Sequence, residues 1–358
     1  MSQVSVSTPG RICLFGEHLD YLGLPVIAAA INRRIRITGS QRSDRKVFIN
    51  LPDINEREEF ELSGSSLSYT KPRDYFRSCY NVLVRHGYQF SKGVECEVHG
   101  NIPINSGTSS SSALVASWLH FLMRMSDRPR LLSRQEIGNM ANEAETLEFG
   151  EPGGMMDHYS TAIGDVIYLE SEPKIYIEEL RPKLGAFVLG DSLEAKDTLD
   201  ILGRLRNGVN GIVKKIQEGN PDFSLQTADV LEIADYRPFL SGGENTLLEG
   251  TISNRDLLRE ARQELEAADL NHIRLGELLN LHHANLRDAQ RISTPKIDRM
   301  LEAALNAGAL GGKINGSGGG GCMFAYAPGH AGAVAEAIER AGGAAYIIHV
   351  DEGTKVEE

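Results

Sequence analysis

The stretch NSGTSSSSAL, residues 105–114, decides how the rest of the chain is interpreted. A glycine leads into a threonine and four consecutive serines, and the apolar run VASWLHFLM follows directly. Serine runs are typical of loops and linkers, but a linker does not continue into a run this apolar. The pattern therefore predicts a serine-rich turn that opens a buried helix from Ser109 to about Met125.

The start of such a helix is a suitable site for an anion. Its first N–H groups have no partner inside the helix, and the helix dipole is positive there. Gly107 permits a tight turn, and the serine hydroxyls can reach phosphate oxygens or Mg²⁺. The alternative is that a serine simply caps a core helix. The chain contains no GxxxxGK[ST] loop, so this is not the P-loop motif.

Two further glycine-rich stretches are candidates for binding. GKINGSGGGGC, residues 312–322, contains GxGxxG, but the following CMFAYA predicts a strand, whereas a dinucleotide site requires a helix there. We expect this stretch to be a backbone cradle or a lid over a ligand. In EAETLEFGEPGGMMDHYS, residues 143–160, Glu145 and Asp157 are candidates to bind a metal or accept a proton. The alternative for Asp157 is an ordinary helix cap.

Length and charge narrow the class of protein. A chain of 358 residues predicts two domains or lobes, and a net charge of −12 argues against nucleic acid or an anionic membrane as a partner. The four cysteines have no CxxC spacing, so neither a disulfide framework nor a zinc site is expected. The N-terminus lacks the features of a signal peptide, and no apolar run reaches the ~18 residues of a membrane span, so we expect a cytoplasmic protein.

Strands and helices are mixed without regular alternation, which predicts an α+β fold with a lobe boundary near residues 165–175. Ser133 and Glu136 form a capping box, and Thr294 with Pro295 starts a later helix. We expect further helices over residues 74–87, 198–218 and 255–285. The expected strands cover residues 4–15, 26–40, 46–51, 58–62, 93–100, 165–170, 186–191, 322–327 and 344–350.

Five stretches, in order along most of the chain, resemble the galactokinase/homoserine kinase/mevalonate kinase (GHMP) superfamily, and galactokinase most. PGRICLFGEHLDYLG (9–23) is similar to PGRxNxIGEHxDYxGG, and NIPINSGTSSSSA (101–113) is similar to PxxxGLSSSA. AETLEFGEPGGMMDH (144–158) is similar to AEHxFxGxPCGxMDQ with no gap. LLNLHHANLRDAQRISTPKIDRML (278–301) and GGKINGSGGGGC (311–322) resemble LMNxSHxSLRDxxxVSxPELDxLV and GARMTGAGFGGC.

The resemblance implies a fold and an activity. The fold would have a ribosomal-S5-like α/β lobe (residues 1–170) and a ferredoxin-like α+β lobe (residues 171–358), with the active site in the cleft between them. The activity would be ATP-dependent phosphoryl transfer to a small-molecule hydroxyl, with ATP and Mg²⁺ required. The sugar substrate and ATP are the expected partners.

The resemblance also implies roles for individual residues. Asp157 would take the proton from the attacking hydroxyl, and Arg11 would keep Asp157 ionised and stabilise the transferring charge. Ser111 (or Ser110) and Glu145 would hold Mg²⁺. The ATP-binding residues would be Pro103, Gly107, Thr108, Ser109, Ser110, Ser111, Ser112, Gly316 and Gly318. The residues at the sugar would be Glu17, His18, Asp20, Gly154 and Asp157.

The positions that select the acceptor depart from the galactokinase pattern. The stretch 188–208 has no tyrosine where galactokinases place one against the sugar, and Gly319 replaces an aromatic residue, which would make its loop more mobile. The acceptor pocket could instead be lined by Asp191, Ser192, Glu194 and Lys196. A sugar 1-kinase is the leading interpretation; a mevalonate-type kinase, a heptose-phosphate kinase and a non-catalytic ligand sensor stay open. His282 and His283 are expected to be structural.

Overall fold

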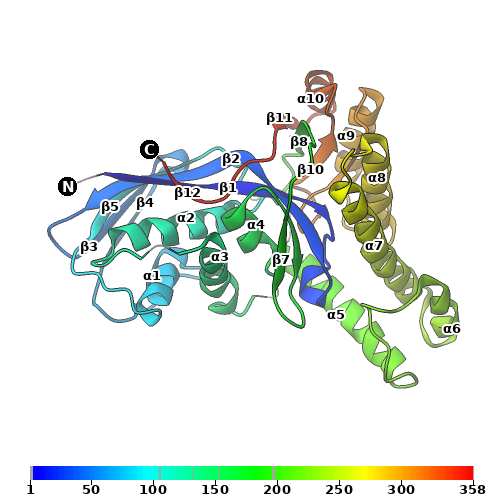
Figure 1. Cartoon of the computed structure of the whole chain (residues 1–358), viewed down its shortest axis with the longest axis horizontal. Helices are drawn as coiled ribbons and strands as arrows, with labels where there is room; N and C mark the ends of the chain where they lie inside the picture. Colours follow the sequence, from blue (N-terminus) through cyan, green and yellow to red (C-terminus); the bar gives the residue numbers. More distant parts are fainter. Residues whose placement is uncertain (1–2, 105, 131, 152, 196–197, 358) are drawn as a thin grey trace.

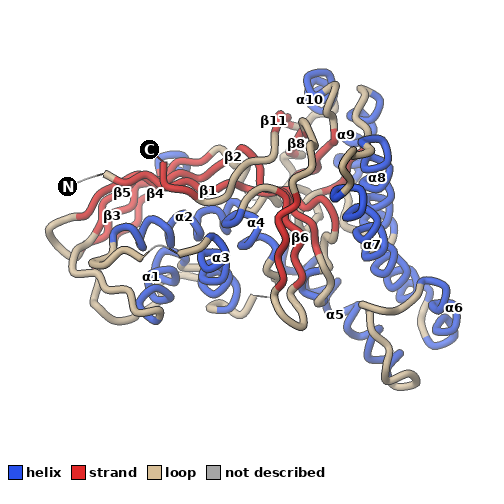
Figure 2. The backbone as a smooth tube through the Cα atoms, viewed as in Figure 1, coloured by secondary structure: helices blue, strands red, loops and turns tan. Residues whose placement is uncertain are grey.

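The computed structural model describes residues 3–104, 106–130, 132–151, 153–195 and 198–357. Within these residues the chain forms two β-sheets, each with helices packed against it, which confirms the predicted α+β class (Figures 1 and 2). Strand pairing is antiparallel in both sheets except between β3 and β5.

The predicted serine-rich turn lies beside the larger sheet, where it contacts the first strand. In the described part of the chain it has eight strands in the order β12-β1-β2-β5-β3-β4, and β6 pairs with β2 while β7 pairs with β6. One half of the long strand β2 pairs with β6 and the other half with β5. The strands are β1 (Val4–Phe15), β2 (Val26–Gln41), β3 (Lys46–Leu51), β4 (Glu56–Glu61), β5 (Val94–Gly100), β6 (Val166–Glu170), β7 (Tyr176–Leu180) and β12 (Lys355–Glu357).

The smaller sheet has the order β11-β8-β10-β9, and helices α8, α9 and α10 pack against it. The long helix α7 packs along α8, as Figure 1 shows. The strands are β8 (Phe187–Asp191), β9 (Gly311–Ile314), β10 (Cys322–Tyr326) and β11 (Ala344–Ile348). The helices of this region are α5 (Thr198–Gln217), α6 (Ile233–Tyr236), α7 (Gly242–Glu266), α8 (His272–Asp288), α9 (Pro295–Asn306) and α10 (Ala331–Arg340).

Four helices lie on one face of the larger sheet: α1 (Tyr75–Arg85), α2 (Ser110–Met125), α3 (Arg134–Asn142) and α4 (Met156–Ile163). A π-helical turn, η3 (Glu143–Leu147), continues α3. Short 3-10 turns complete the described secondary structure at η1 (Asp20–Leu22), η2 (Pro52–Ile54), η4 (Val230–Glu232) and η5 (Arg237–Phe239).

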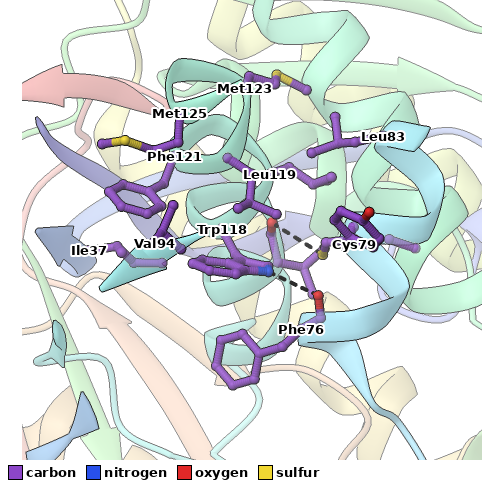
Figure 3. Close-up of a cluster of buried hydrophobic side chains, with 14 of the residues drawn as sticks. Ile37, Phe76, Cys79, Leu83, Val94, Trp118, Leu119, Phe121, Met123 and Met125 are labelled. Atoms are coloured by element: carbon purple, nitrogen blue, oxygen red, sulfur yellow. Dashed lines mark hydrogen bonds between the residues drawn. The ribbon is translucent and has the colours of Figure 1, made fainter. Parts of the chain in front are cut away.

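The core under the larger sheet fixes α2 in place. Trp118 is buried at the middle of this helix, and its Nε1–H donates to the carbonyl oxygen of Phe76 in α1 over 3.0 Å (Figure 3). Phe121, Leu119 and Leu122 of the same helix face the same cluster. Truncating a buried aromatic residue of this kind costs about 3–5 kcal/mol of stability. The start of α2 is therefore held rigidly beside the end of β1.

Most predicted elements are confirmed, but one helix prediction is wrong. Residues 255–285 do not form one helix: α7 ends at Glu266, and α8 begins at His272 with Asn271 as its N-cap. The start of α7 was also missed, although Ser241 and Glu244 form a capping box there. The elements α4, β7, β9 and β12 were not predicted. The division into domains at residue 170 stays a prediction; β7 and β12, which follow it, pair within the larger sheet.

Among the described residues, no helix is both long enough and apolar enough to cross a membrane.

Candidate active site

The serine-rich turn, the end of β1 and the start of α4 surround one pocket, and the loop between β9 and β10 closes it from the other half of the chain. Arg11, Asp157 and Leu202 of α5 are among the residues that line it. The predicted site residues that line this pocket are Arg11, Glu17, His18, Asp20, Gly107, Ser109, Ser110, Ser111, Ser112, Glu145, Gly154, Asp157 and Gly316.

The turn before α2 presents unpartnered donors to the pocket. Gly107 has φ +90° and Ser109 has φ +58°, so the chain reverses sharply before the helix begins at Ser110. Ser109 occupies the N-cap position, but its side chain makes no capping hydrogen bond. Within the described residues, its buried hydroxyl makes no hydrogen bond of normal geometry. It nevertheless lies near enough to Asp157 to help lower the pKa of that carboxyl. A simple N-cap does not explain this serine, whereas an anion would satisfy these donors.

Asp157 and Arg11 form an ion pair in the pocket. Arg11 Nε and Nη2 both donate to Asp157 Oδ1, over 2.8 and 2.6 Å, and Nη1 donates to the carbonyl oxygen of Gly107. Burial raises the pKa of Asp157, but the charges of Arg11 and His158, together with the hydrogen bonds from Arg11 and the nearby hydroxyl of Ser109, outweigh burial and hold the pKa below its usual range. The carboxylate is therefore ionised at neutral pH and can accept a proton.

Glu145 faces the serine-rich turn from the π-helical turn that follows α3. Its Oε2 lies 2.9 Å from His158 Nε2 of α4. Burial would raise the pKa of Glu145, but the hydrogen bond from His158, together with the nearby hydroxyls of Ser111 and Ser112, lowers it. An ionised carboxylate beside serine hydroxyls is a set of hard oxygen ligands. Such a set fits Mg²⁺, which proteins usually hold through one or two carboxylates and the phosphates of a nucleotide.

His18 and Asp20 bring the turn after β1 to the lining of the pocket. His18 has φ +63°, and its ring joins Tyr21 Oη (2.8 Å from Nδ1) to the carbonyl oxygen of Ser317 (3.1 Å from Nε2). Burial lowers the pKa of His18 to about 4, so this ring is neutral. Asp20 accepts hydrogen bonds from the backbone N–H groups of Tyr21 and Met156.

The Asp20 carboxylate is close to both the backbone and a second acid. A Cβ atom at Gly154 would lie 1.9 Å from Asp20 Oδ2, so only glycine allows this approach. Burial and the charge of Asp157 raise the pKa of Asp20 to about 6. This part of the pocket therefore offers oxygen acceptors at fixed positions, which suits a ligand with several hydroxyl groups.

Glu17 is tied to the smaller sheet. Its Oε2 lies 2.7 Å from Lys313 Nζ of β9, and the same ammonium donates to the carbonyl oxygen of Cys13 over 2.8 Å. Both side chains are buried, at 3% and 0% exposure. A buried cation needs such partners, because an unpaired charge inside a protein is strongly destabilising. The pair therefore joins the turn after β1 to the strand that leads into the third glycine-rich loop.

The third glycine-rich loop packs directly on the serine-rich turn. A Cβ at Gly316 would lie 2.7 Å from Gly107 Cα, so the two backbones touch. The carbonyl oxygen of Gly107 accepts from Asn315 Nδ2, and that of Ser106 accepts from the N–H of Cys322, both over 2.7 Å. The loop is also held by a hydrogen bond from Gly319 N to Ile292 O over 2.7 Å. The loop therefore lines the pocket beside the serine-rich turn.

Some predicted residues lie outside the lining of this pocket. Pro103 and Thr108 support the turn from behind, since the carbonyl oxygen of Pro103 accepts from the hydroxyls of Ser106 and Thr108. Gly318 packs against Ile292. Asp191, Ser192 and Glu194 were expected to line the acceptor pocket, but none of them does; Glu194 accepts from the hydroxyl of Thr294 instead. Lys196 lies outside the described residues.

The pocket also contains residues that the sequence analysis missed. Tyr21, His158 and Ser317 stand inside the quoted motifs, beside residues that were chosen, so their positions could have been found. Arg73, Tyr75 and Leu202 lie in segments without a motif, and the sequence contained no signal for them. His282 and His283 are buried in α8, and His282 stacks on Phe15, in line with a structural role.

Comparison with known proteins places this geometry in a family. Residues 74–165 match the N-terminal domain of GHMP kinases, residues 259–344 match the C-terminal part of GHMP kinases, and residues 2–41 match the galactokinase galactose-binding signature. The mevalonate kinase of Thermococcus gammatolerans is 31% identical over 374 residues, covering 99% of each chain. A galactokinase of Actinobacillus succinogenes is 28% identical, covering 91% of this chain and 85% of its own.

Solved structures show the same fold. The galactokinase of Lactococcus lactis, crystallised with galactose, superposes with a TM-score of 0.85 at 23% identity, covering 99% of this chain and 95% of its own. The mevalonate kinase of Methanococcus jannaschii superposes with a TM-score of 0.75 at 17% identity, covering 98% and 99%. Because the family's two regions match in order and a relative is 31% identical along the whole chain, this protein belongs to the GHMP kinases, which transfer a phosphoryl group from ATP to a hydroxyl group.

Proposed function

We propose that the protein is a sugar 1-kinase, which phosphorylates the anomeric hydroxyl of galactose or of a related sugar. The observation that carries this proposal is the acceptor end of the pocket, where Asp20, His18 and Asp157 converge as hydrogen-bonding side chains. Of the cations that line the described pocket, Arg11 is paired with Asp157 and Arg73 with Glu151. A polyhydroxylated acceptor fits this end better than an acid that would need an unpaired cation.

In the proposed reaction the protein acts mainly by positioning. The unpartnered amides and hydroxyls at the start of α2 bind the phosphates of ATP. The sugar hydroxyl lies against the Asp157 carboxylate and gives its proton to it as the hydroxyl oxygen attacks the terminal phosphorus of ATP. The bond between that phosphorus and the bridging oxygen breaks, and ADP leaves. A weakly basic carboxylate is sufficient, because little proton transfer is needed early in a loose phosphoryl-transfer transition state. Arg11 keeps Asp157 ionised and offers charge to the transferring group.

Glu145 and the hydroxyl of Ser111 or Ser110 would hold Mg²⁺ in this scheme. The ion, when bound, neutralises charge on the nucleotide phosphates. A cytoplasmic location and a role in carbohydrate metabolism stay predictions.

A mevalonate-type acceptor is the second candidate, because the relative at 31% identity is a mevalonate kinase. The pocket and the galactokinase signature over residues 2–41 favour the sugar. The heptose-phosphate kinase and the ligand sensor have no observation of their own here; an intact Arg11–Asp157 pair supports a catalyst over a sensor.

An ADP-release screen tests the proposal. The purified protein is incubated with Mg·ATP and, separately, with monosaccharides, uronic acids, heptose phosphates and mevalonate, with Asp157→Asn as the blank. Turnover with galactose or a related free sugar, with the phosphate found on the anomeric oxygen by ³¹P NMR, supports the proposal. Turnover confined to mevalonate or to a phosphorylated heptose would overturn it.

A further inference from the structure

His158 is a buried histidine next to the proposed catalytic base that no role assigned above uses. It lies in α4, directly after Asp157, and is only 3% exposed. In the pattern AEHxFxGxPCGxMDQ this position carries glutamine, and the chain has histidine instead. A buried imidazole beside two carboxylates needs a physical reason, because burial removes its hydration.

The partner of His158 is Glu145, which comes from a different element. His158 Nε2 lies 2.9 Å from Glu145 Oε2, while His158 Nδ1 has no hydrogen-bond partner in the described part of the chain. Glu145 can only accept a hydrogen bond when ionised, so Nε2 carries the hydrogen. This donor is present in the neutral and in the charged ring alike, and the contact therefore does not depend on the protonation of His158.

The contact also determines how Glu145 is presented. Glu145 stands on a π-helical turn, a geometry that is frequent at functional sites and that shifts side chains away from ordinary helical positions. A hydrogen bond to one carboxylate oxygen fixes the rotamer and leaves the other oxygen for ligands on the side of Ser111 and Ser112. Groups that orient a metal-binding carboxylate in this way are worth about 10- to 100-fold in metal affinity or activity.

We propose that His158 is a positioning residue that fixes the Glu145 carboxylate toward the serine-rich turn and thereby sets the Mg²⁺ requirement of nucleotide binding. This inference rests on the proposed function, in which Glu145 holds Mg²⁺. It does not depend on which acceptor is phosphorylated. Glutamine can provide an N–H donor at a similar reach, whereas leucine fills similar space and provides none.

The test measures the binding of a non-hydrolysable ATP analogue by calorimetry, with and without Mg²⁺. We expect His158→Leu to weaken binding in the presence of Mg²⁺ by about 10- to 100-fold, while metal-free binding changes less than twofold. His158→Gln should restore Mg²⁺-dependent binding to within about threefold of the unmodified protein, on the same hydrogen-bond argument.

A second histidine–glutamate pair provides the matched control. His86 Nε2 lies 2.8 Å from Glu143 Oε2, at the start of the same π-helical turn but at the surface and outside the pocket. His86→Leu should therefore leave both affinities unchanged. A loss in this variant equal to that in His158→Leu would overturn the inference, because disturbance of the turn would then be sufficient.

A double-mutant cycle separates positioning from folding. In a Glu145→Gln background, His158→Leu should have little further effect on Mg²⁺-dependent binding, since the group it positions is already altered. Should His158→Leu not fold, His158→Asn, whose amide is too short to reach Glu145, takes its place in every arm. Normal Mg²⁺ dependence in the folded variant, or failure of glutamine to rescue it, would overturn the inference. Because no acceptor is present, an incorrect sugar assignment would not affect these results.

Discussion

The two ends of the pocket are built from different kinds of groups. The proposed phosphate end consists of backbone amides and hydroxyls from the turn before α2, and Gly316 of the third glycine-rich loop contacts Gly107 of that turn. The proposed acceptor end consists of side chains that are held by hydrogen bonds to other residues, as with His18 between the nearby Tyr21 and the distant Ser317. The phosphate end needs only small residues and a helix start, while the acceptor end needs a set of exact pairings.

The largest expected effect lies where the two ends meet. Asp157→Ala should lower kcat by about 10²- to 10⁴-fold, because it removes the proposed proton acceptor, while binding of the ATP analogue persists. The measurement is steady-state turnover alongside calorimetry. Asp351→Asn provides the control. Asp351 Oδ2 pairs with Arg34 Nη1 at 2.8 Å, outside the pocket, so this variant should keep full turnover. Near-normal turnover of Asp157→Ala would exclude it as the base.

The dependence of the acceptor end on distant partners is tested by Lys313→Met. Removing the cation leaves Glu17 buried without its partner, which should lower the free energy of unfolding by about 3–5 kcal/mol. We also expect the KM of the acceptor to rise more than that of ATP. Urea denaturation and substrate titrations measure the two effects. Lys46→Met, at an exposed pair 3.7 Å from Glu59, should cost less than about 0.5 kcal/mol.

The result is sharpened by adding Glu17→Leu to Lys313→Met. A double variant should recover part of the lost stability, because neither charge is then left alone in the interior. If the double variant loses more free energy of unfolding than the two single variants combined, the two charges do not compensate each other, and the prediction is wrong.

At the phosphate end, Glu145→Ala should raise the Mg²⁺ concentration for half-maximal activity by about tenfold or more, since the only carboxylate proposed as an Mg²⁺ ligand is lost. The acceptor KM should change little, which would separate this end from the other. Activity is titrated with Mg²⁺ at fixed, saturating ATP. An unchanged titration curve would remove Glu145 from the metal site.

The smallest effect concerns the acidity of the proposed acceptor end. The pKa of Asp20 is about 6 in the folded protein against an ordinary value of 3.8, so the folded state binds a proton more readily than the unfolded state between these pH values. The stability that this group contributes therefore increases as the pH falls from 6 to 4. Urea denaturation of Asp20→Asn across pH 4 to 7 should lack this contribution. Equal pH dependence in both proteins would contradict the shifted pKa.

The sequence predicted the serine-rich turn and the helix after it well, because the pattern that determines them is local. A glycine, a serine run and an apolar helix stand next to one another in the chain, and the turn before α2 follows from them. Strands such as β1 and the capping box at Ser133 are likewise determined by short patterns. The break between α7 and α8 was missed because residues 267–271 contain neither glycine nor proline to mark the end of a helix.

The acceptor end could be predicted only in part, because its geometry depends on contacts between distant segments. Glu17 was predicted to face the substrate, but its pairing with Lys313 joins residues 296 positions apart, which no short pattern encodes. The π-helical turn under Glu145 has no recognisable periodicity either, and so the partnership with His158 was not foreseen. Asp191, Ser192 and Glu194 are not among the residues that line the described pocket, because the loop after β8 turns toward Thr294 and Gly321.

The contact between Gly107 and Gly316 has a consequence for how the protein becomes active during synthesis. On the ribosome, the serine-rich turn emerges some two hundred residues before the loop that completes its wall. A nascent chain would therefore hold an incomplete nucleotide site until residues 315–322 leave the exit tunnel. If the serine-rich turn binds ATP as proposed, tight ATP capture is then expected only from the nearly finished polypeptide.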